Sequence, residues 1–348
     1  MKTTFISTYS LLNSPRSSLV RMQADAARYN QEIASGRHAD VGLTLGGRMS
    51  QAVSLRADYD NLTAMIDANS RTRTRLDVTV EALGTIRAMA DEFQAELLSV
   101  PHAQRGSEVI RNAARDKLAA LIGSLNSAVD GQFLFAGINS GVQPINEYGA
   151  GSPNKNAVDA AYLAAFGVTQ ADPGVSDISA ADMANFLDTA FADLFFNDAN
   201  WKANWSNASD AVQRSRISRS ETLTSSVSAN EMAIRQLAAA YTMVFDLGSD
   251  KLNTDALQVV IDKATELMGN AIAQIIDLEA HMGVAQNRID TANTNMEAQK
   301  KILATRVGDL EDVDPAEAKV RLDAVLTQIE MSYSLTVRLQ SLSLLNYL

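Results

Sequence analysis

Residues 254–307 read TDALQVVIDKATELMGNAIAQIIDLEAHMGVAQNRIDTANTNMEAQKKILATRV, and this stretch decides the fold class. Steps of alternately four and three residues through it meet apolar side chains at every position except Gln299. Such a seam is typical of a long helix that packs on partner helices. At about 1.5 Å per residue, the predicted helix is about 80 Å long. The seam consists of Leu257, Ile261, Ala264, Met268, Ala271, Ile275, Leu278, Met282, Ala285, Ile289, Ala292, Met296, Gln299 and Leu303.

A second seam of the same spacing runs from Leu55 to Leu97, where nine of thirteen positions are apolar. Pro101 follows this seam and stops the predicted helix. A third amphipathic helix is expected from Ser107, as its N-cap, to Asp130. Because these helices can share one core, we predict a mainly α fold, an elongated long-helix bundle.

Glycine and proline crowd between residues 131 and 174, so regular helix gives way to turns there. Residues 140–215 carry nine acidic and three basic side chains, together with both tryptophans. We expect a small inserted α/β outer domain, with short helices from Ala157 and over 180–196, and a strand or hairpin over 213–228. The expected division is 1–40, an N-terminal core-forming helix; 41–135 and 229–312, two parts of a helical rod; 136–228, the insert with its hairpin; and 313–348, a C-terminal core-forming helix.

Composition excludes several classes of function. The chain has no cysteine and three histidines, which removes thiolate chemistry and leaves no metal-ligand pair. Its net charge of -11 argues against nucleic acid as a partner. No apolar stretch approaches the roughly 20 residues of a membrane span, and the first ten residues lack the apolar core of a cleavable signal peptide. No nucleophile–base pair or phosphate-binding loop is present, so we expect no enzyme, no cofactor, no metal site and no membrane contact.

Both ends of the sequence carry an apolar stripe. At the amino end Phe5, Leu12, Leu19, Ala26 and Ile33 recur every seven residues, with Met22 and Tyr29 between them. At the other end the stripe comprises Leu322, Val325, Leu326, Ile329, Tyr333, Leu335, Leu339, Leu342 and Leu345. A single helix cannot bury such a stripe alone. Periodicity by itself leaves two alternatives open, an intramolecular bundle or assembly with other chains.

Four segments carry a resemblance to a known family. They are Glu32-Ile33-Ala34-Ser35-Gly36-Arg37, Phe133-Leu134-Phe135-Ala136-Gly137, His281-Met282-Gly283-Val284-Ala285-Gln286-Asn287-Arg288-Ile289 and Leu310-Glu311-Asp312-Val313-Asp314-Pro315. Together with the two terminal stripes, they resemble the bacterial flagellin family. The segment 341–348, SLSLLNYL, is similar to that of the members found at the hook–filament junction. One departure is Val41–Gly47, which stands where the family has a Pro-Ser-Asp-Asp-type loop, so contacts of that loop are not carried over.

The resemblance implies a structural component that joins hook to filament and polymerises through paired terminal helices. It further implies self-assembly into a ring, contact with the first hook-associated protein and with flagellin, a flagellar export chaperone, type III export and an extracellular location. A filament flagellin and a cytosolic coiled-coil scaffold or adaptor are the alternatives. By itself the Gln286 to Arg288 segment is typical of a solvated face, and the resemblance favours an interface there. The assembly residues it implies are Phe5, Leu12, Leu19, Met22, Tyr29, Ile33, Gln286, Asn287, Arg288, Leu335, Leu339, Leu342, Leu345, Tyr347 and Leu348.

Overall fold

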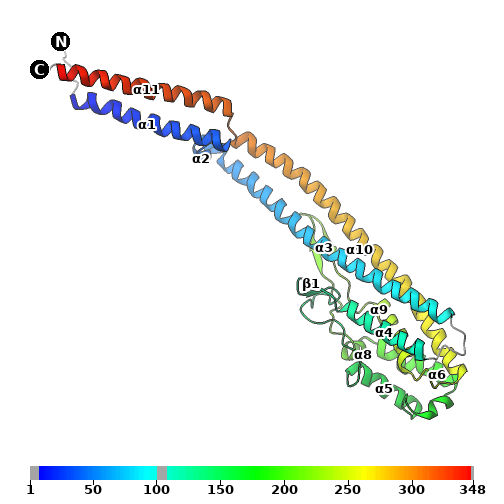
Figure 1. The fold of residues 1–348 in the computed structure, drawn as a ribbon. Coiled ribbons are helices and arrows are strands. Elements are labelled where there is room, and N and C mark those ends of the chain that lie inside the picture. Colours follow the sequence, from blue (N-terminus) through cyan, green and yellow to red (C-terminus); the bar gives the residue numbers. More distant parts are fainter. Residues whose placement is uncertain (1–7, 100–107, 346–348) are drawn as a thin grey trace. The chain divides into compact units, whose positions relative to one another are not determined.

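The computed structural model describes residues 8–99 and 108–345 of the 348-residue chain (Figure 1). The chain divides into two compact units. Unit 1 combines both ends of the sequence, Met1–Ala64 with Asn295–Leu348, and unit 2 is Met65–Thr294. The long helices α3 and α10 each contribute residues to both units.

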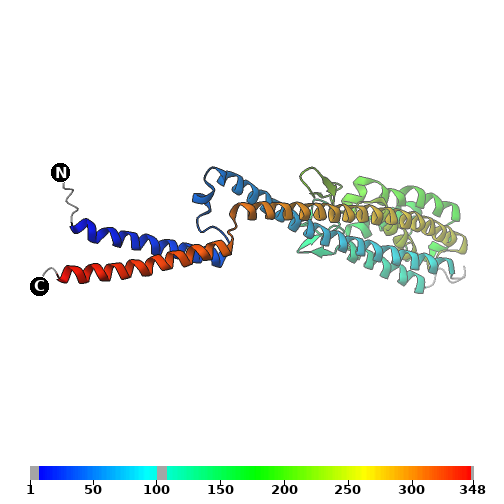
Figure 2. The same cartoon turned by 90° about the horizontal axis from the view of Figure 1, so that it is seen from above.

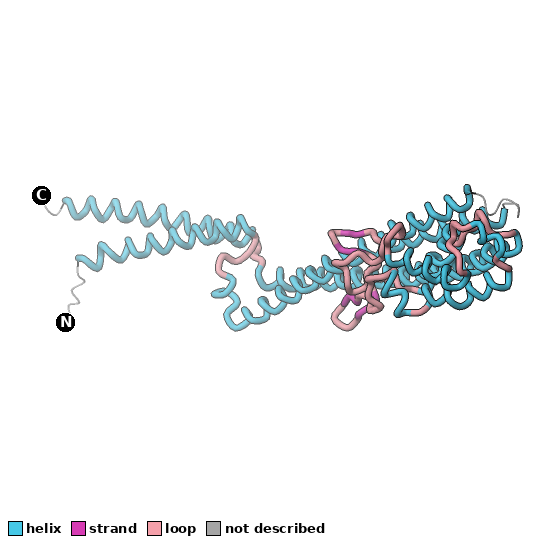
Figure 3. Tube along the Cα trace, turned by 90° about the horizontal axis from the view of Figure 1, so that it is seen from below, coloured by secondary structure: helices cyan, strands magenta, loops and turns pink. Residues whose placement is uncertain are grey.

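Helices dominate the described residues, and the sheets are two short hairpins (Figure 3). The long elements are α1 (Thr8–Ser35), α3 (Met49–Ser99), α4 (Glu108–Leu125), α9 (Met232–Asp246), α10 (Thr254–Glu311) and α11 (Pro315–Leu345). The short ones are α2 (Val41–Leu45), η1 (Gly46–Arg48), β1 (Ala128–Val129), β2 (Gln132–Phe133), α5 (Pro153–Phe166), η3 (Pro173–Asp177), α6 (Ala180–Phe186), the π-helix η4 (Leu187–Phe191), α7 (Ala192–Phe196), α8 (Asp198–Asn204), β3 (Arg214–Arg216) and β4 (Thr222–Thr224).

In unit 2, α3 and α10 run antiparallel to one another (Figures 1 and 2). Polar contacts mark the pairing along its length: Arg73 Nε lies 3.3 Å from Asp290 Oδ1, and Arg87 Nε lies 3.2 Å from Glu279 Oε2. Many of the seam residues predicted from the sequence are buried, among them Leu76, Leu83, Ala90, Leu97, Ile261, Ile275 and Ile289, while others, such as Leu55, Ile66, Val80 and Leu278, are half-buried. The four-and-three spacing thus buries one stripe of each helix, and the mainly α prediction is confirmed.

Asn69 is a polar residue at a seam position, and its side chain is nevertheless buried. Its amide nitrogen donates to the carbonyl oxygen of Ile217 at 2.9 Å and to Asn293 Oδ1 at 2.8 Å. Both N–H groups of the amide are therefore used, which offsets the cost of removing them from water. The contacts fix α3 against α10 and against the hairpin region at one register.

The helix expected over 107–130 is shorter than predicted. It ends at Leu125, because Asp130 and Gly131 take the left-handed backbone conformation, with φ of 51° and 75°, in the turn between β1 and β2. The expected cap Ser107 lies outside the described residues. Residues 41–48, which include the segment that departs from the family's loop, form α2 and η1. The Asp40 side chain caps α2 by accepting the Leu43 N–H at 2.8 Å.

The inserted region packs around buried aromatic side chains. Trp201 and Trp205 stack with ring centroids 5.5 Å apart, and both are buried. The Trp201 indole N–H donates to Asn230 Oδ1 at 2.9 Å, so the ring has a polar partner inside the core. The helices expected from 157 and over 180–196 are present, and the hairpin expected over 213–228 is β3 paired antiparallel with β4. α9, which is almost wholly buried, packs on α4.

Candidate assembly interface

The two terminal helices pack against each other in unit 1 (Figures 1 and 2). The half-buried apolar residues of α1 follow the heptad found in the sequence and comprise Leu19, Met22, Ala26, Tyr29 and Ile33. On α11 the half-buried residues recur at the same spacing and comprise Leu322, Val325, Ile329, Ser332 and Thr336. Gln23 Nε2 also donates to the Tyr333 hydroxyl at 3.2 Å. We assign these residues to the contact between α1 and α11.

This contact leaves large apolar side chains of the terminal helices exposed. Among residues 16–35 and 315–338, the buried ones are Glu32 and Ala318. Large apolar side chains instead point to solvent, one on α1 and the others beside the contact row of α11. The exposed residues are Val20 (64%), Val320 (68%), Leu326 (44%), Met331 (59%), Tyr333 (50%), Leu335 (56%) and Val337 (66%), and we call this set the open face. A group of large exposed apolar side chains of this kind is typical of a surface that another molecule covers.

The interface residues expected on the terminal helices divide into four groups. Leu19, Met22, Tyr29 and Ile33 lie in the contact with α11, whereas Leu335 lies on the open face. Phe5, Tyr347 and Leu348 lie outside the described residues. The structure gives Leu12, Leu339, Leu342 and Leu345 a helical backbone, and their side chains are likewise outside the description.

Charged residues of α1 lie beside the contact row. Arg28 pairs with Asp25 at 3.1 Å and donates to the Tyr29 hydroxyl at 3.2 Å. The hydrogen bond to Tyr29 raises the pKa of Arg28, and the Asp25 carboxylate acts in the same direction. The Arg28 guanidinium therefore stays charged. Its hydrogen bond satisfies the Tyr29 hydroxyl while the tyrosine ring is half-buried between the helices.

The first and fourth family-like segments meet where the terminal helices connect to the rest of unit 1. Arg37 and Asp312 form an isolated antiparallel bridge. Around it the Val313 N–H donates to the Gly36 carbonyl at 2.9 Å, and the His38 N–H donates to the Glu311 carbonyl at 2.9 Å. Both segments resemble the family, but nothing in either sequence indicates that they touch.

The second family-like segment ends at Gly137, whose φ is 63°. A Cβ atom at this position would lie 2.4 Å from the Ser209 carbonyl oxygen and 2.6 Å from that of Ala211. Glycine is therefore required by a close approach of backbone to backbone. Because the preceding Leu134, Phe135 and Ala136 are buried, this segment holds the inserted region on the helices of unit 2.

The third family-like segment makes contacts within the chain. Gln286 Nε2 donates to Asp77 Oδ1 at 2.8 Å, and Arg288 Nε donates to Glu221 Oε1 at 2.7 Å. Asn287 is exposed on α10. An assembly role for these three residues stays a prediction, and their contacts in one chain are polar links on the surface of unit 2.

Replacing this arginine, Arg288→Gln, is expected to lower the free energy of unfolding by less than about 1 kcal/mol. The pair with Glu221 is exposed on both sides, at 55% and 33%, and exposed pairs contribute little. Denaturant unfolding checks the size of the loss. A decrease of several kcal/mol would instead show that the contact with Glu221 holds the hairpin in place.

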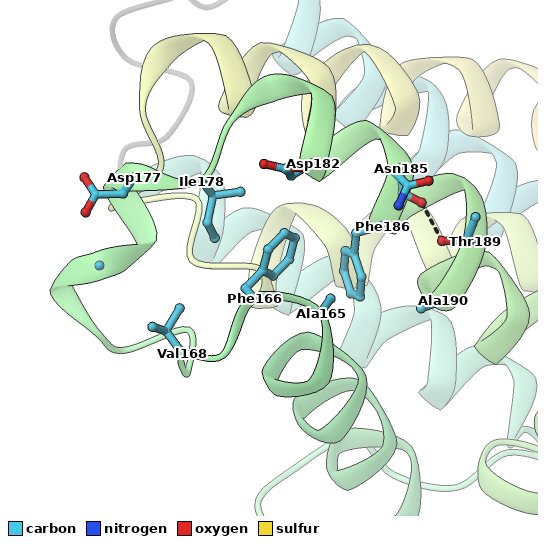
Figure 4. Close-up of a pocket in the computed structure, with 11 residues that line it drawn as sticks. Ala165, Phe166, Val168, Asp177, Ile178, Asp182, Asn185, Phe186, Thr189 and Ala190 are labelled. Atoms are coloured by element: carbon cyan, nitrogen blue, oxygen red, sulfur yellow. Dashed lines mark hydrogen bonds between the residues drawn. The ribbon is translucent and has the colours of Figure 1, made fainter.

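An open groove of about 460 Å³ lies in the inserted region (Figure 4). The rings of Phe166 and Phe186 face it, with centroids 5.1 Å apart. Asp182, on its rim, accepts a hydrogen bond from Ser179 Oγ at 2.7 Å and belongs to the N-cap of α6. Its lining residues include no base beside a nucleophile, so the groove has no catalytic arrangement.

Metal sites and membrane-spanning helices are absent from the part of the chain that the structure describes. Residues 8–99 and 108–345 hold no group of three histidine, aspartate or glutamate side chains that could bind a metal ion. Nor does this part of the chain contain a helix with the length and apolar character needed to cross a bilayer. The open face of α1 and α11 is accordingly the strongest candidate for a functional surface.

Comparison with known proteins places both ends of the chain in one family. Residues 6–140 match the bacterial flagellin N-terminal helical region, and residues 265–348 match the bacterial flagellin C-terminal helical region. No curated protein gives a significant sequence match. Among solved structures, the chain is similar to a flagellar hook-associated protein from Vibrio parahaemolyticus, with 14% identity, a TM-score of 0.44, and coverage of 77% of this chain and 96% of that one. The two matched regions span more than half of the sequence, and the chain belongs to the bacterial flagellin family.

Proposed function

We propose that this flagellar protein joins the hook to the filament and polymerises through the terminal helices α1 and α11. The observation that carries the assembly part is the open face, a set of large apolar side chains that the α1–α11 contact leaves exposed. The resemblance of residues 341–348 to junction members of the family supports the location at the junction. Membership of the family makes the chain a structural component of the flagellum and not an enzyme.

The single chain leaves apolar side chains of its terminal helices exposed to water. Removing apolar surface from water stabilises by about 25 cal/mol per Å². Two helices that share one contact row gain this stabilisation on one side only, and the outer sides of α11 remain in water. Further helices packed on those sides would bury the apolar surface that remains exposed and would add to the stabilisation. Neighbouring copies of this chain supply helices with the same apolar pattern, and repeated contacts between identical copies can close into a ring.

The resemblance to the family, and not the open face itself, implies which partners the chain would have. In the assembled state, the α1–α11 pair of one copy would pack on those of its neighbours, with the first hook-associated protein on one side of the ring and flagellin on the other. Before export, an apolar surface of this kind needs a cover, which an export chaperone would provide. The protein would then act outside the cell, after passage through the flagellar type III channel.

Immunogold labelling of isolated flagella tests this proposal. A junction protein is expected to give one label where the hook meets the filament and a low copy number per flagellum. Label along the whole filament would show that the chain is a filament flagellin. Retention of the protein in the cytoplasm of flagellated cells would favour a coiled-coil scaffold and would contradict the proposal.

A further inference from the structure

Two breaks in the helical structure of unit 1 lie side by side. One is the segment after α1, residues 36–40, and the other is the turn between α10 and α11, residues 312–314. The bridge between Arg37 and Asp312 and the backbone hydrogen bonds on either side of it join the two segments. The end of α1 is thus tied to the start of α11 through the main chain.

Two buried carboxylates lie at the same place. The Glu311 side chain is 2% exposed and forms an ion pair with Arg56 of α3. The Glu32 side chain is 7% exposed, accepts the Ala39 N–H at 3.1 Å and lies 3.8 Å from His38 Nδ1. Buried carboxylates persist only where a counter-charge or hydrogen-bond donors compensate them. Each carboxylate here holds one of the two segments.

The buried Glu311 carboxylate depends on its ion pair with Arg56. Glu311 is the last residue of α10, where the carbonyl groups of the helix end already concentrate negative charge. The carboxylate is also removed from water, so the Arg56 guanidinium is the compensating charge. Arg56 itself is half-exposed, at 49%, and water can solvate it without Glu311. Replacing Arg56 should therefore lower the stability of this region more than replacing Glu311 does.

We propose that residues 36–38 and 311–313 form a brace that fixes the register between α1 and α11, with Arg56 as its positioning residue. A slip of one residue along a helix turns its side chains by about 100°. Such a slip of α11 against α1 would exchange contact residues for residues of the open face. The brace therefore determines which side chains α11 offers to other copies, and this consequence rests on the proposed function.

The experiment uses the full chain and four variants. Arg56→Gln leaves Glu311 buried without its counter-charge, Glu311→Gln removes the charge, and the double variant removes both partners. Arg306→Gln replaces an exposed arginine on α10 and is the matched control. Two quantities are measured for each protein: the rates of amide hydrogen exchange at His38 and Val313, and incorporation into flagella sheared from complemented cells.

We expect Arg56→Gln to accelerate amide exchange at His38 and Val313 by about tenfold or more. In the double variant the exchange rates should return most of the way to those of the wild type. Incorporation should fall in Arg56→Gln and return in the double variant, while Arg306→Gln behaves like the wild type. Unchanged exchange in Arg56→Gln would overturn the positioning role of Arg56. Faster exchange with normal incorporation would show that the brace does not determine which side chains α11 offers to other copies. A wild-type chain that never enters flagella would refute the proposed function, while exchange still decides whether the brace exists.

Discussion

The double substitution Met331→Asp with Leu335→Asp is expected to leave the chain folded and exported but absent from the flagellum. Both side chains lie on the open face, four residues apart on α11, and they make little contact within the chain. Packing of another helix would bury two carboxylates without partners, at a cost of several kcal/mol each. Incorporation into sheared flagella should therefore fall by at least about a hundredfold. Quantitative immunoblots of the sheared fraction and of the medium measure the result.

Leu163→Asp is the matched control for this experiment. Leu163 is 47% exposed on α5 in unit 2, so the substitution changes apolar exposure and charge away from the terminal helices. It should leave incorporation unchanged. Normal incorporation of the Met331 and Leu335 double variant, with the variant protein present in the sheared fraction, would show that assembly does not use the open face.

Gly137→Ala is expected to lower the free energy of unfolding of unit 2 by about 3 kcal/mol. The new Cβ would lie 2.4 Å and 2.6 Å from two carbonyl oxygens, and the backbone would keep its unfavourable φ of 63°. Neither carbonyl can move freely, because Ala211 O accepts the Ile138 N–H and the Ser209 N–H donates to Ala136 O. Both tryptophans are buried in unit 2, so their fluorescence during denaturant unfolding reports this loss.

Gly141→Ala provides the comparison for Gly137. No atom lies within 4 Å of a Cβ built at Gly141, so the change in unfolding free energy should stay within about 0.5 kcal/mol. If the two variants unfold at the same denaturant concentration, the family-like Leu-Phe-Ala-Gly segment is not held by the close backbone approach described above.

The sequence was sufficient for the parts of the fold that depend on periodicity. Most apolar seam residues of α3 and α10 are buried or half-buried where the four-and-three spacing places them, and the half-buried row of α1 is the heptad of Leu19 to Ile33. A repeating apolar position identifies the side of a helix that is removed from water. Gln299, the one polar residue of the long seam, is exposed.

Other features depend on contacts between residues far apart in the sequence. The bridge of Arg37 with Asp312 consists of backbone atoms, and backbone pairing across such a separation leaves no composition signal. The sequence places both tryptophans in the insert but does not show that they are buried, and the partner of the Trp201 indole N–H, Asn230, lies 29 residues away. Likewise, periodicity placed Leu335 with the stripe of α11 and could not separate the contact row from the open face.

The central claim is that the open face is exposed in the single chain and covered in the flagellum. Because the chain has no cysteine, Met331→Cys introduces a unique thiol on this face, and Leu163→Cys introduces one on unit 2. The rate of thiol labelling is measured for each variant as a monomer and in isolated flagella. We expect Cys at 331 to react freely in the monomer and at least about a hundred times more slowly in flagella, with no such change at 163. Equal labelling rates at 331 in the two states would contradict the account.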